Sequence, residues 1–240
     1  MVHLFVGGGA EGKIPELDKK FALELSKQRE KKLLYLPIAH PEITYKGIKY
    51  TYAGMFEGIK WHYAKFGVTQ IDMWTDLSNK TSNDLNGYGA IYIGGGNTFS
   101  LMDQFRKNGF DKLLNEYMDK NGIVYGSSAG AAILGKDICI VSKFGEDPDI
   151  NHINLTDLSS FDKLDGKIVF PHYREVDDNN LQNYIKKTKS MVIAIPSLSG
   201  LHISGNEAEV LGVSDAYFFK NTLKLKLYVG KRFAFPDLLR

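Results

Sequence analysis

Residues 126–130 read Gly126-Ser127-Ser128-Ala129-Gly130, and they join the apolar run Ile123-Val124-Tyr125 to the small-residue run Ala131-Ala132-Ile133-Leu134. A strand that enters a helix through G-x-S-x-G is typical of a nucleophile elbow. Its tight turn lifts the central hydroxyl above the sheet, and its glycines allow a close backbone approach. The pattern predicts Ser128 as a nucleophile. The alternative is a Gly/Ser-rich turn in which Ser127 or Ser128 only caps the next helix.

The chain before this elbow alternates between strand and helix patterns. Short apolar runs predict strands over residues 3–6, 33–37, 70–74, 90–93 and 123–125, and amphipathic patterns predict helices over residues 15–27, 50–66, 98–106 and 110–120. Strands that are nearly continuous in apolar residues and separated by helices indicate an α/β fold, with a mainly parallel sheet and helices on both of its faces.

The pattern changes after the elbow. Strands are predicted over residues 167–170, 191–195, 200–204, 209–211, 217–220 and 224–229, with one clear helix over 179–187. We expect these strands to add antiparallel pairs to one side or edge of the sheet. The chain shows no repeat and no Pro/Ser-rich linker, so residues 1–240 are expected to form a single domain.

Composition narrows the class of protein. The chain of 240 residues is 43% hydrophobic and carries a formal charge of +2, with its lysines spread along the sequence, so neither nucleic acid nor a membrane is an expected partner. The N-terminal residues do not resemble a signal peptide. Cys139 is the one cysteine and lies between two isoleucines, which predicts a buried small hydrophobe rather than a nucleophile. We expect a cytoplasmic protein of undetermined oligomeric state.

Two glycine-rich loops follow predicted strands. Gly94-Gly95-Gly96 ends the strand at residues 90–93, where ligand sites gather in parallel sheets. A hydrolase needs two backbone donors for its oxyanion. We expect the amide of Ala129 to be one, and that of Gly96, or failing it Gly95, to be the other; a simple tight turn is the alternative.

The second loop, residues 7–12, matches the G-x-G-x-x-G pattern of dinucleotide-binding proteins. Pro15 indicates that the helix begins after the motif, and the second strand ends without the acidic residue that binds a ribose hydroxyl. We therefore interpret this loop as another wall of the active site and expect neither a cofactor nor a metal.

A serine nucleophile needs an imidazole to accept its proton and a carboxylate to orient that imidazole. Of the six histidines, His172 stands just past the apolar strand 167–170 and a proline, at an expected sheet end; a surface or structural histidine is the alternative, and His202 is the reserve. No carboxylate is as clearly marked. Candidates are Asp147 and its acidic neighbours, which precede His172, and Glu207 and Glu209, which follow it.

Three segments together resemble the S51 serine peptidases, the family of peptidase E and cyanophycinase. They are Ile93-Gly94-Gly95-Gly96-Asn97-Thr98-Phe99, the elbow with Ala131, and Phe170-Pro171-His172-Tyr173, and they span about a third of the chain. The resemblance implies a fold like the class I glutamine amidotransferases, of flavodoxin-like architecture, with serine in place of cysteine at the elbow. It also implies Ser128 as nucleophile and His172 as base.

The resemblance offers two positions for the third member of the triad. An Asp in an acidic-proline segment after the elbow corresponds to Asp147. A Glu in a Leu-Pro-Glu-Gly segment has no counterpart, because Ile195-Pro196-Ser197-Leu198 stands there. Peptidase E also uses an arginine downstream of the histidine to hold an aspartyl substrate, whereas this chain has Asp177-Asp178-Asn179-Asn180 in the comparable stretch. Aspartyl preference is therefore not expected.

These observations favour a metal-independent serine peptidase that acts on short peptides. An esterase of the α/β-hydrolase type is an alternative, although that fold generally opens with antiparallel strands. A non-catalytic, small-molecule-binding relative that has lost its triad acid is the other alternative.

Overall fold

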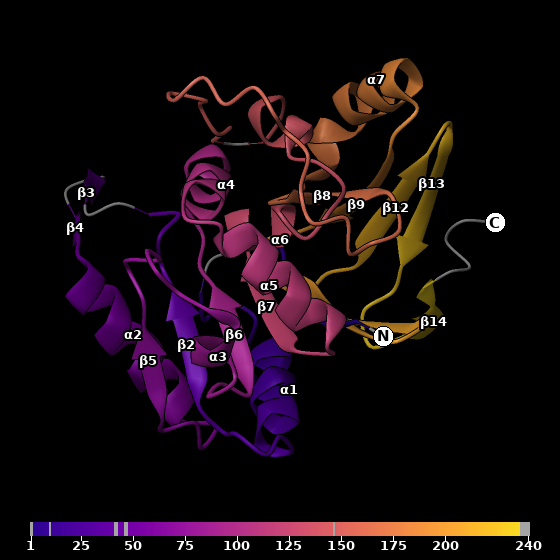
Figure 1. Ribbon diagram of the computed structural model, residues 1–240. Helices are drawn as coiled ribbons and strands as arrows, with labels where there is room; N and C mark the ends of the chain where they lie inside the picture. The colour runs from indigo at the N-terminus through magenta and orange to yellow at the C-terminus, as the bar shows by residue number, and fades with distance from the viewer. Residues whose placement is uncertain (1, 10, 41–42, 46–47, 146, 236–240) are drawn as a thin grey trace.

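The computed structural model describes residues 2–9, 11–40, 43–45, 48–145 and 147–235 (Figure 1). Its larger sheet has the strand order β14-β11-β10-β1-β7-β6-β2-β5. Five of these strands are parallel: β1 (His3–Gly7), β7 (Ile123–Ser127), β6 (Ala90–Ile93), β2 (Leu33–Leu36) and β5 (Ile71–Met73). The other three run antiparallel to their neighbours: β10 (Ser199–Ser204), β11 (Glu207–Gly212) and β14 (Arg232–Ala234). The expected mainly parallel sheet with antiparallel strands on one edge is confirmed.

A second sheet was not expected. It has the order β13-β12-β9-β8, formed by β8 (Lys167–Pro171), β9 (Met191–Ile195), β12 (Ala216–Lys220) and β13 (Leu223–Leu227). The predicted strands of the C-terminal third are therefore divided between two sheets instead of all joining one. Within the second sheet, β8 and β9 pair in parallel. Their apolar pattern is the same whichever sheet they enter, and the sequence therefore gave no sign of this division. A small hairpin, β3 (Ile43–Tyr45) and β4 (Ile48–Tyr50), precedes α2.

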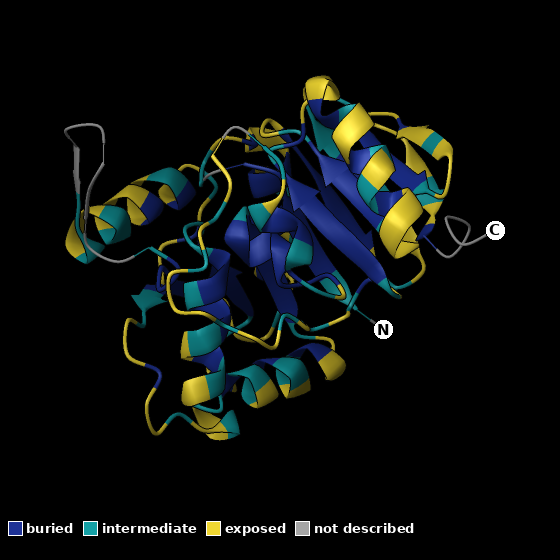
Figure 2. Cartoon of the chain, turned by 90° about the horizontal axis from the view of Figure 1, so that it is seen from above, coloured by how far each residue is buried: buried dark blue, intermediate teal, exposed yellow. Residues whose placement is uncertain are grey.

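Helices cover both faces of the larger sheet, as expected. The helices are α1 (Pro15–Ser26), α2 (Tyr52–Ala64), α3 (Ser82–Leu85), α4 (Thr98–Lys107), α5 (Phe110–Asp119), α6 (Ala129–Ala132) and α7 (Asp178–Thr188), with 3-10 turns at Cys139–Ser142 and Glu175–Asp177. In Figure 2 the central strands form a continuous buried band, while the outer faces of α7 and of the other helices are exposed.

Alternate residues of each central strand enter two different cores. On β1, for example, Phe5 faces the core that contains α1 and α2, whereas Leu4 and Val6 face the core that contains α4, α5 and α6. Such alternation follows from the two-residue period of a strand. The second core also includes apolar residues of β8, β9 and β12, so the two sheets share it.

The core beneath α1 is rich in aromatic rings. Phe21 of α1 makes edge-to-face contacts with Phe5, Tyr63, Tyr92 and Tyr125, at centroid distances of 5.2 to 6.3 Å. Aromatic rings favour this geometry because the positive edge of one ring meets the negative face of another. Phe21 therefore fastens α1 and α2 to three strands of the larger sheet.

Within the described ranges, no helix combines the length and the apolar character that crossing a membrane requires.

Replacing Phe21 with alanine should lower the free energy of unfolding by about 3–5 kcal/mol, because it removes a fully buried ring and leaves a cavity among four others. Urea denaturation followed by circular dichroism measures the change. Leu23 lies on the same helix and is 51% exposed, so Leu23→Ala should cost less than about 1 kcal/mol. Equal losses in the two variants would contradict the assigned packing.

Candidate active site

Ser128 lies at the turn between β7 and α6, with φ 52° and ψ −109°. A non-glycine residue with a positive φ is uncommon and carries strain, which is frequent at functional sites. The flanking glycines make this turn possible. A Cβ added to Gly126 would lie 2.1 Å from the carbonyl oxygen of Gly130, and one added to Gly130 would lie 2.3 Å from that of Ile93. Larger residues would push the elbow away from β6.

The hydroxyl of Ser128 forms no capping hydrogen bond to α6, although the residue occupies the capping position. Its Oγ instead lies 2.7 Å from Nε2 of His172. The alternative in which Ser128 serves only as a helix cap therefore lacks its defining hydrogen bond. The geometry suits proton transfer from the hydroxyl to the imidazole.

His172 follows β8 and reaches Ser128 from the second sheet. Its backbone N–H donates to the carbonyl of Gly8, which follows β1, at 2.9 Å. The next residue, Tyr173, donates its N–H to the carbonyl of Ile195 at the end of β9. These two bonds tie the carboxyl ends of β8 and β9 to the carboxyl end of β1, beside the elbow.

The other ring nitrogen of His172 contacts a serine. Nδ1 of His172 lies 2.9 Å from Oγ of Ser197, which follows β9. The parallel register pairs Pro171 with Ile195, so both side chains project from neighbouring strand ends. Sequence reasoning noted Ser197 only as a departure from the glutamate of the resembling family. The hydrogen bond is the new finding, and it makes a chain of three side chains from Ser128 through His172 to Ser197.

Asp147, the predicted triad acid, is exposed. Its neighbour Glu146 lies outside the described residues. Asp149 accepts a hydrogen bond from the backbone N–H of Thr98, at 2.8 Å, where α4 begins. Burial raises the pKa of the Asp149 carboxyl, and the bonds from Thr98 oppose that rise. The role of Asp147 stays a prediction.

The triple-glycine loop lies against the nucleophile, as the oxyanion prediction requires. A Cβ added to Gly95 would lie 3.2 Å from Cβ of Ser128 and 3.7 Å from its Oγ. The N–H of Gly95 donates to Oε1 of Glu11 at 3.0 Å, whereas those of Gly96 and Ala129 make no hydrogen bond to any described residue. The N–H groups of Gly96 and Ala129 are therefore not occupied by a described acceptor, and their role as oxyanion donors stays a prediction.

The glycine loop after β1 lines the same site. The carbonyl of Gly7 accepts the N–H of Ser128 at 3.0 Å, and the carbonyl of Gly9 accepts the hydroxyl of Ser127. A Cβ added to Gly9 would lie 2.0 Å from the carbonyl oxygen of Ser197. These glycines thus serve close packing around the elbow.

The reserve base and the cysteine lie in other settings. His202 is on β10, where its ring stacks on Phe5 at 4.5 Å and its Nε2 lies 3.1 Å from Nε2 of His3. Cys139 is half-buried, slightly more exposed than expected, and burial raises the pKa of its thiol to about 11. That shift disfavours the thiolate at neutral pH. Among the described residues, no three His, Cys, Asp or Glu side chains converge as metal ligands.

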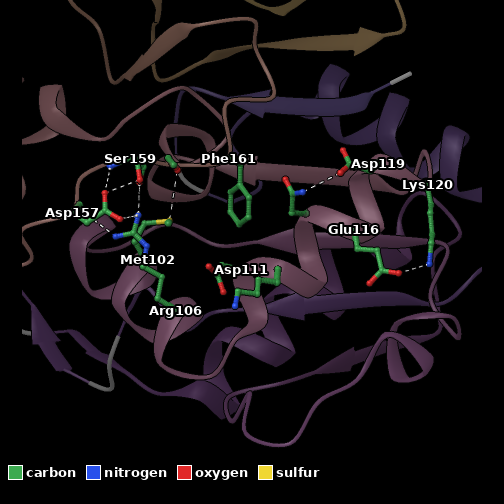
Figure 3. Close-up of a pocket in the computed structure, with 12 residues that line it drawn as sticks. Met102, Arg106, Asp111, Glu116, Asp119, Lys120, Asp157, Ser159 and Phe161 are labelled. Atoms are coloured by element: carbon green, nitrogen blue, oxygen red, sulfur yellow. Dashed lines mark hydrogen bonds and ion pairs between the residues drawn. The ribbon is translucent and has the colours of Figure 1, made fainter.

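A hollow of about 550 Å³ lies between α4, α5 and residues 157–161 (Figure 3) and contains neither Ser128 nor His172. Several of its charged residues are paired with one another: Arg106 binds Asp157 and the carbonyl of Ser159, and Lys120 binds Glu116. It offers no nucleophile beside a base, so we assign the site to the Ser128 elbow.

The model of peptidase family S51 matches residues 4–211. An uncharacterized peptidase of Listeria monocytogenes, Lmo0363, is 28% identical over 145 residues, which are 58% of this chain and 68% of that protein. Peptidase E of Actinobacillus pleuropneumoniae is 29% identical over 139 residues, covering 57% of this chain and 59% of the relative.

A solved structure shares the fold. A peptidase from an acI-B1 actinobacterium superimposes with a TM-score of 0.73 at 16% identity, over 98% of this chain and 97% of that one. At this identity the likeness concerns the fold alone, and it includes the strands of the C-terminal third.

The His202 environment predicts a loss of stability in acid. Burial, reinforced by the nearby His3, lowers the pKa of His202 to about 4 from its ordinary value of 6.5. Between pH 6.5 and 4 the unfolded chain binds more protons than the folded one, so the stabilisation present above pH 6.5 falls as the pH drops, by up to about 3 kcal/mol. Urea unfolding at pH 7, 5.5 and 4 measures this change.

His202→Gln should show a weaker pH dependence over this range, because its side chain does not titrate. His152 is exposed, and His152→Gln serves as the matched control that keeps the wild-type slope. An unaltered slope in His202→Gln would refute the assignment.

Proposed function

Because the chain belongs to peptidase family S51, a family of serine peptidases, we propose that it hydrolyses short peptides through an acyl-enzyme formed on Ser128. The observation that supports this most is the 2.7 Å contact between Oγ of Ser128 and Nε2 of His172, at a strained elbow that leaves the hydroxyl uncapped. We further propose one catalytic domain that acts in the cytoplasm without a cofactor.

The reaction begins when His172 accepts the proton of Ser128 as Oγ attacks the scissile carbonyl carbon. The N–H groups of Ala129 and Gly96 stabilise the charge on the carbonyl oxygen, and each such donor contributes on the order of 3 kcal/mol to lowering the barrier. The C–N bond then breaks as Nε2 of His172 returns the proton to the leaving amine. Water, deprotonated by the same imidazole, hydrolyses the ester and frees Ser128.

We propose that Ser197 orients the imidazole ring of His172. For Nε2 to accept the Ser128 proton, Nδ1 must carry a hydrogen, which it donates to Oγ of Ser197. A hydroxyl holds the ring and its tautomer, but it has no charge with which to stabilise the imidazolium. We therefore expect Ser197 to support catalysis less strongly than a carboxylate would. Asp147 remains the carboxylate candidate and is tested beside it.

The non-catalytic alternative keeps one observation in its favour: Nδ1 of His172 contacts the hydroxyl of Ser197, which stands where the family pattern has a glutamate. The α/β-hydrolase alternative has less support, because β1 pairs in parallel with β7 and the chain belongs to another family.

Ser128→Ala should abolish peptide hydrolysis, lowering kcat by about 10⁶-fold, because no other group replaces the attacking oxygen. A fluorophosphonate probe should label the wild-type protein at Ser128, as located by peptide mass spectrometry. Ser127 has its hydroxyl on the carbonyl of Gly9, so Ser127→Ala should still be labelled and is the matched control. Labelling that persists in Ser128→Ala would disprove the nucleophile, and a wild-type protein that is neither labelled nor active would favour the non-catalytic alternative.

Ser197→Ala should lower kcat/KM by about 2–10-fold, the value of one neutral hydrogen bond. Ser197→Glu should raise kcat/KM and move the acid limb of its pH profile to higher pH, because a carboxylate stabilises the imidazolium. Steady-state kinetics across pH 5–9 measures both effects. If Asp147→Asn is the more damaging change and both Ser197 variants resemble the wild type, the orienting group is Asp147 instead.

A further inference from the structure

Glu11 brings a carboxylate to the edge of the catalytic site. It lies in the loop between β1 and α1, and its Oε1 accepts the N–H of Gly95 at 3.0 Å. The Cβ position of Gly95 is 3.7 Å from Oγ of Ser128. Since the amide nitrogen and the Cβ of one residue are about 2.5 Å apart, the carboxylate lies within about 9 Å of the nucleophilic oxygen. A Cβ added to Gly94 would lie 2.6 Å from Oε1 of Glu11, so a larger residue at position 94 would clash with the carboxylate.

The charge of this carboxylate is not balanced by an ion pair within the part of the chain that the structure describes. Within the described ranges, no lysine, arginine or histidine forms an ion pair with Glu11, and its one hydrogen bond comes from a neutral amide. It is half-buried, and its charge adds to the burial that raises the pKa of Tyr35, Tyr92 and Tyr125. A partly desolvated carboxylate without a countercharge is suited to bind a cation that a ligand brings.

We propose that Glu11 binds a cationic nitrogen on the substrate residue that supplies the scissile carbonyl. The inference rests on the proposed function, since it takes Ser128 as the nucleophile. The α-nitrogen and the carbonyl carbon of a residue are about 2.5 Å apart, so with a contact of about 3 Å at each end one residue bridges up to roughly 8 Å. The carboxylate is at most about 9 Å from Oγ of Ser128, a range within which one substrate residue reaches both groups. The cation is either a free α-ammonium group or the side chain of Lys or Arg. An acidic residue at that position is repelled.

Glu11→Gln tests the proposal, because it keeps the shape and the acceptor oxygen for Gly95 while removing the charge. The matched control is Glu16→Gln, which removes an exposed carboxylate on α1. The substrates share one leaving group and differ in the first residue. That residue is Ala, Lys or Asp with a free α-amino group (free Ala, free Lys and free Asp), or Ala or Lys with an acetylated α-amino group (acetyl-Ala and acetyl-Lys). The pair of alanine substrates isolates the α-ammonium group, and the acetylated pair isolates the side chain.

For wild-type protein and Glu16→Gln, we expect kcat/KM to be at least about 10-fold higher for the cationic member of the relevant pair, chiefly through KM, and lowest for free Asp. Glu11→Gln should lose that preference, so that its kcat/KM for the cationic member of the pair falls to that for the uncharged member. Preferences that are unchanged in Glu11→Gln would overturn the proposal.

Fluorophosphonate labelling separates this result from a failure of the proposed function. The probe is uncharged at its reactive group and needs only Ser128 and His172, so Glu11→Gln should be labelled as fast as the wild type. Labelling together with unchanged preferences would reject the role of Glu11 and leave the serine mechanism standing. A wild-type protein that is not labelled would reject both.

Discussion

The close approach of backbone to backbone at Gly126 and Gly130 is the constraint on which the rest of the site depends. Because these glycines have no side chains, carbonyl oxygens lie where a Cβ atom would otherwise be. The chain can therefore turn sharply at Ser128, which has a positive φ. The strain at Ser128 is held by the surrounding sheet, because its N–H is fixed by the carbonyl of Gly7 and the following helix packs on β6. The hydroxyl of Ser128 therefore does not cap α6 and instead contacts the imidazole of His172.

The residues of the proposed active site come from both sheets. Strands β1, β6 and β7 of the larger sheet end in the two glycine loops and the elbow, while β8 and β9 of the smaller sheet end in His172 and Ser197. All five strand ends meet in one place, as expected for sites at the carboxyl edge of parallel strands. The imidazole of His172 thus lies between Ser128, at the end of β7, and Ser197, after the end of β9.

The sequence predicted the fold class correctly, and it singled out Ser128, His172 and the glycine loops, which the structure brings together, because each depends on local patterns. The catalytic roles of these residues stay a proposal. G-x-S-x-G has a turn geometry of its own, and His172 was marked by its position after an apolar strand and a proline. The second sheet could not be predicted, since the apolar patterns of β8 and β9 do not say which strands they pair with. Ser197 was missed for a related reason: a serine two residues past a strand gains significance only once β8 and β9 are aligned in register.

The seam between the sheets gives the site an unusual mechanical dependence. Donor and acceptor of the first proton transfer belong to separate β-layers, joined near the site by the backbone bond from His172 to Gly8 and, beneath it, by apolar contacts of the shared core. The 2.7 Å hydrogen bond between Oγ of Ser128 and Nε2 of His172 weakens steeply when its donor and acceptor lose their alignment. A shift of one sheet against the other would therefore break the contact between Ser128 and His172, while nearly every helix and strand kept its own shape.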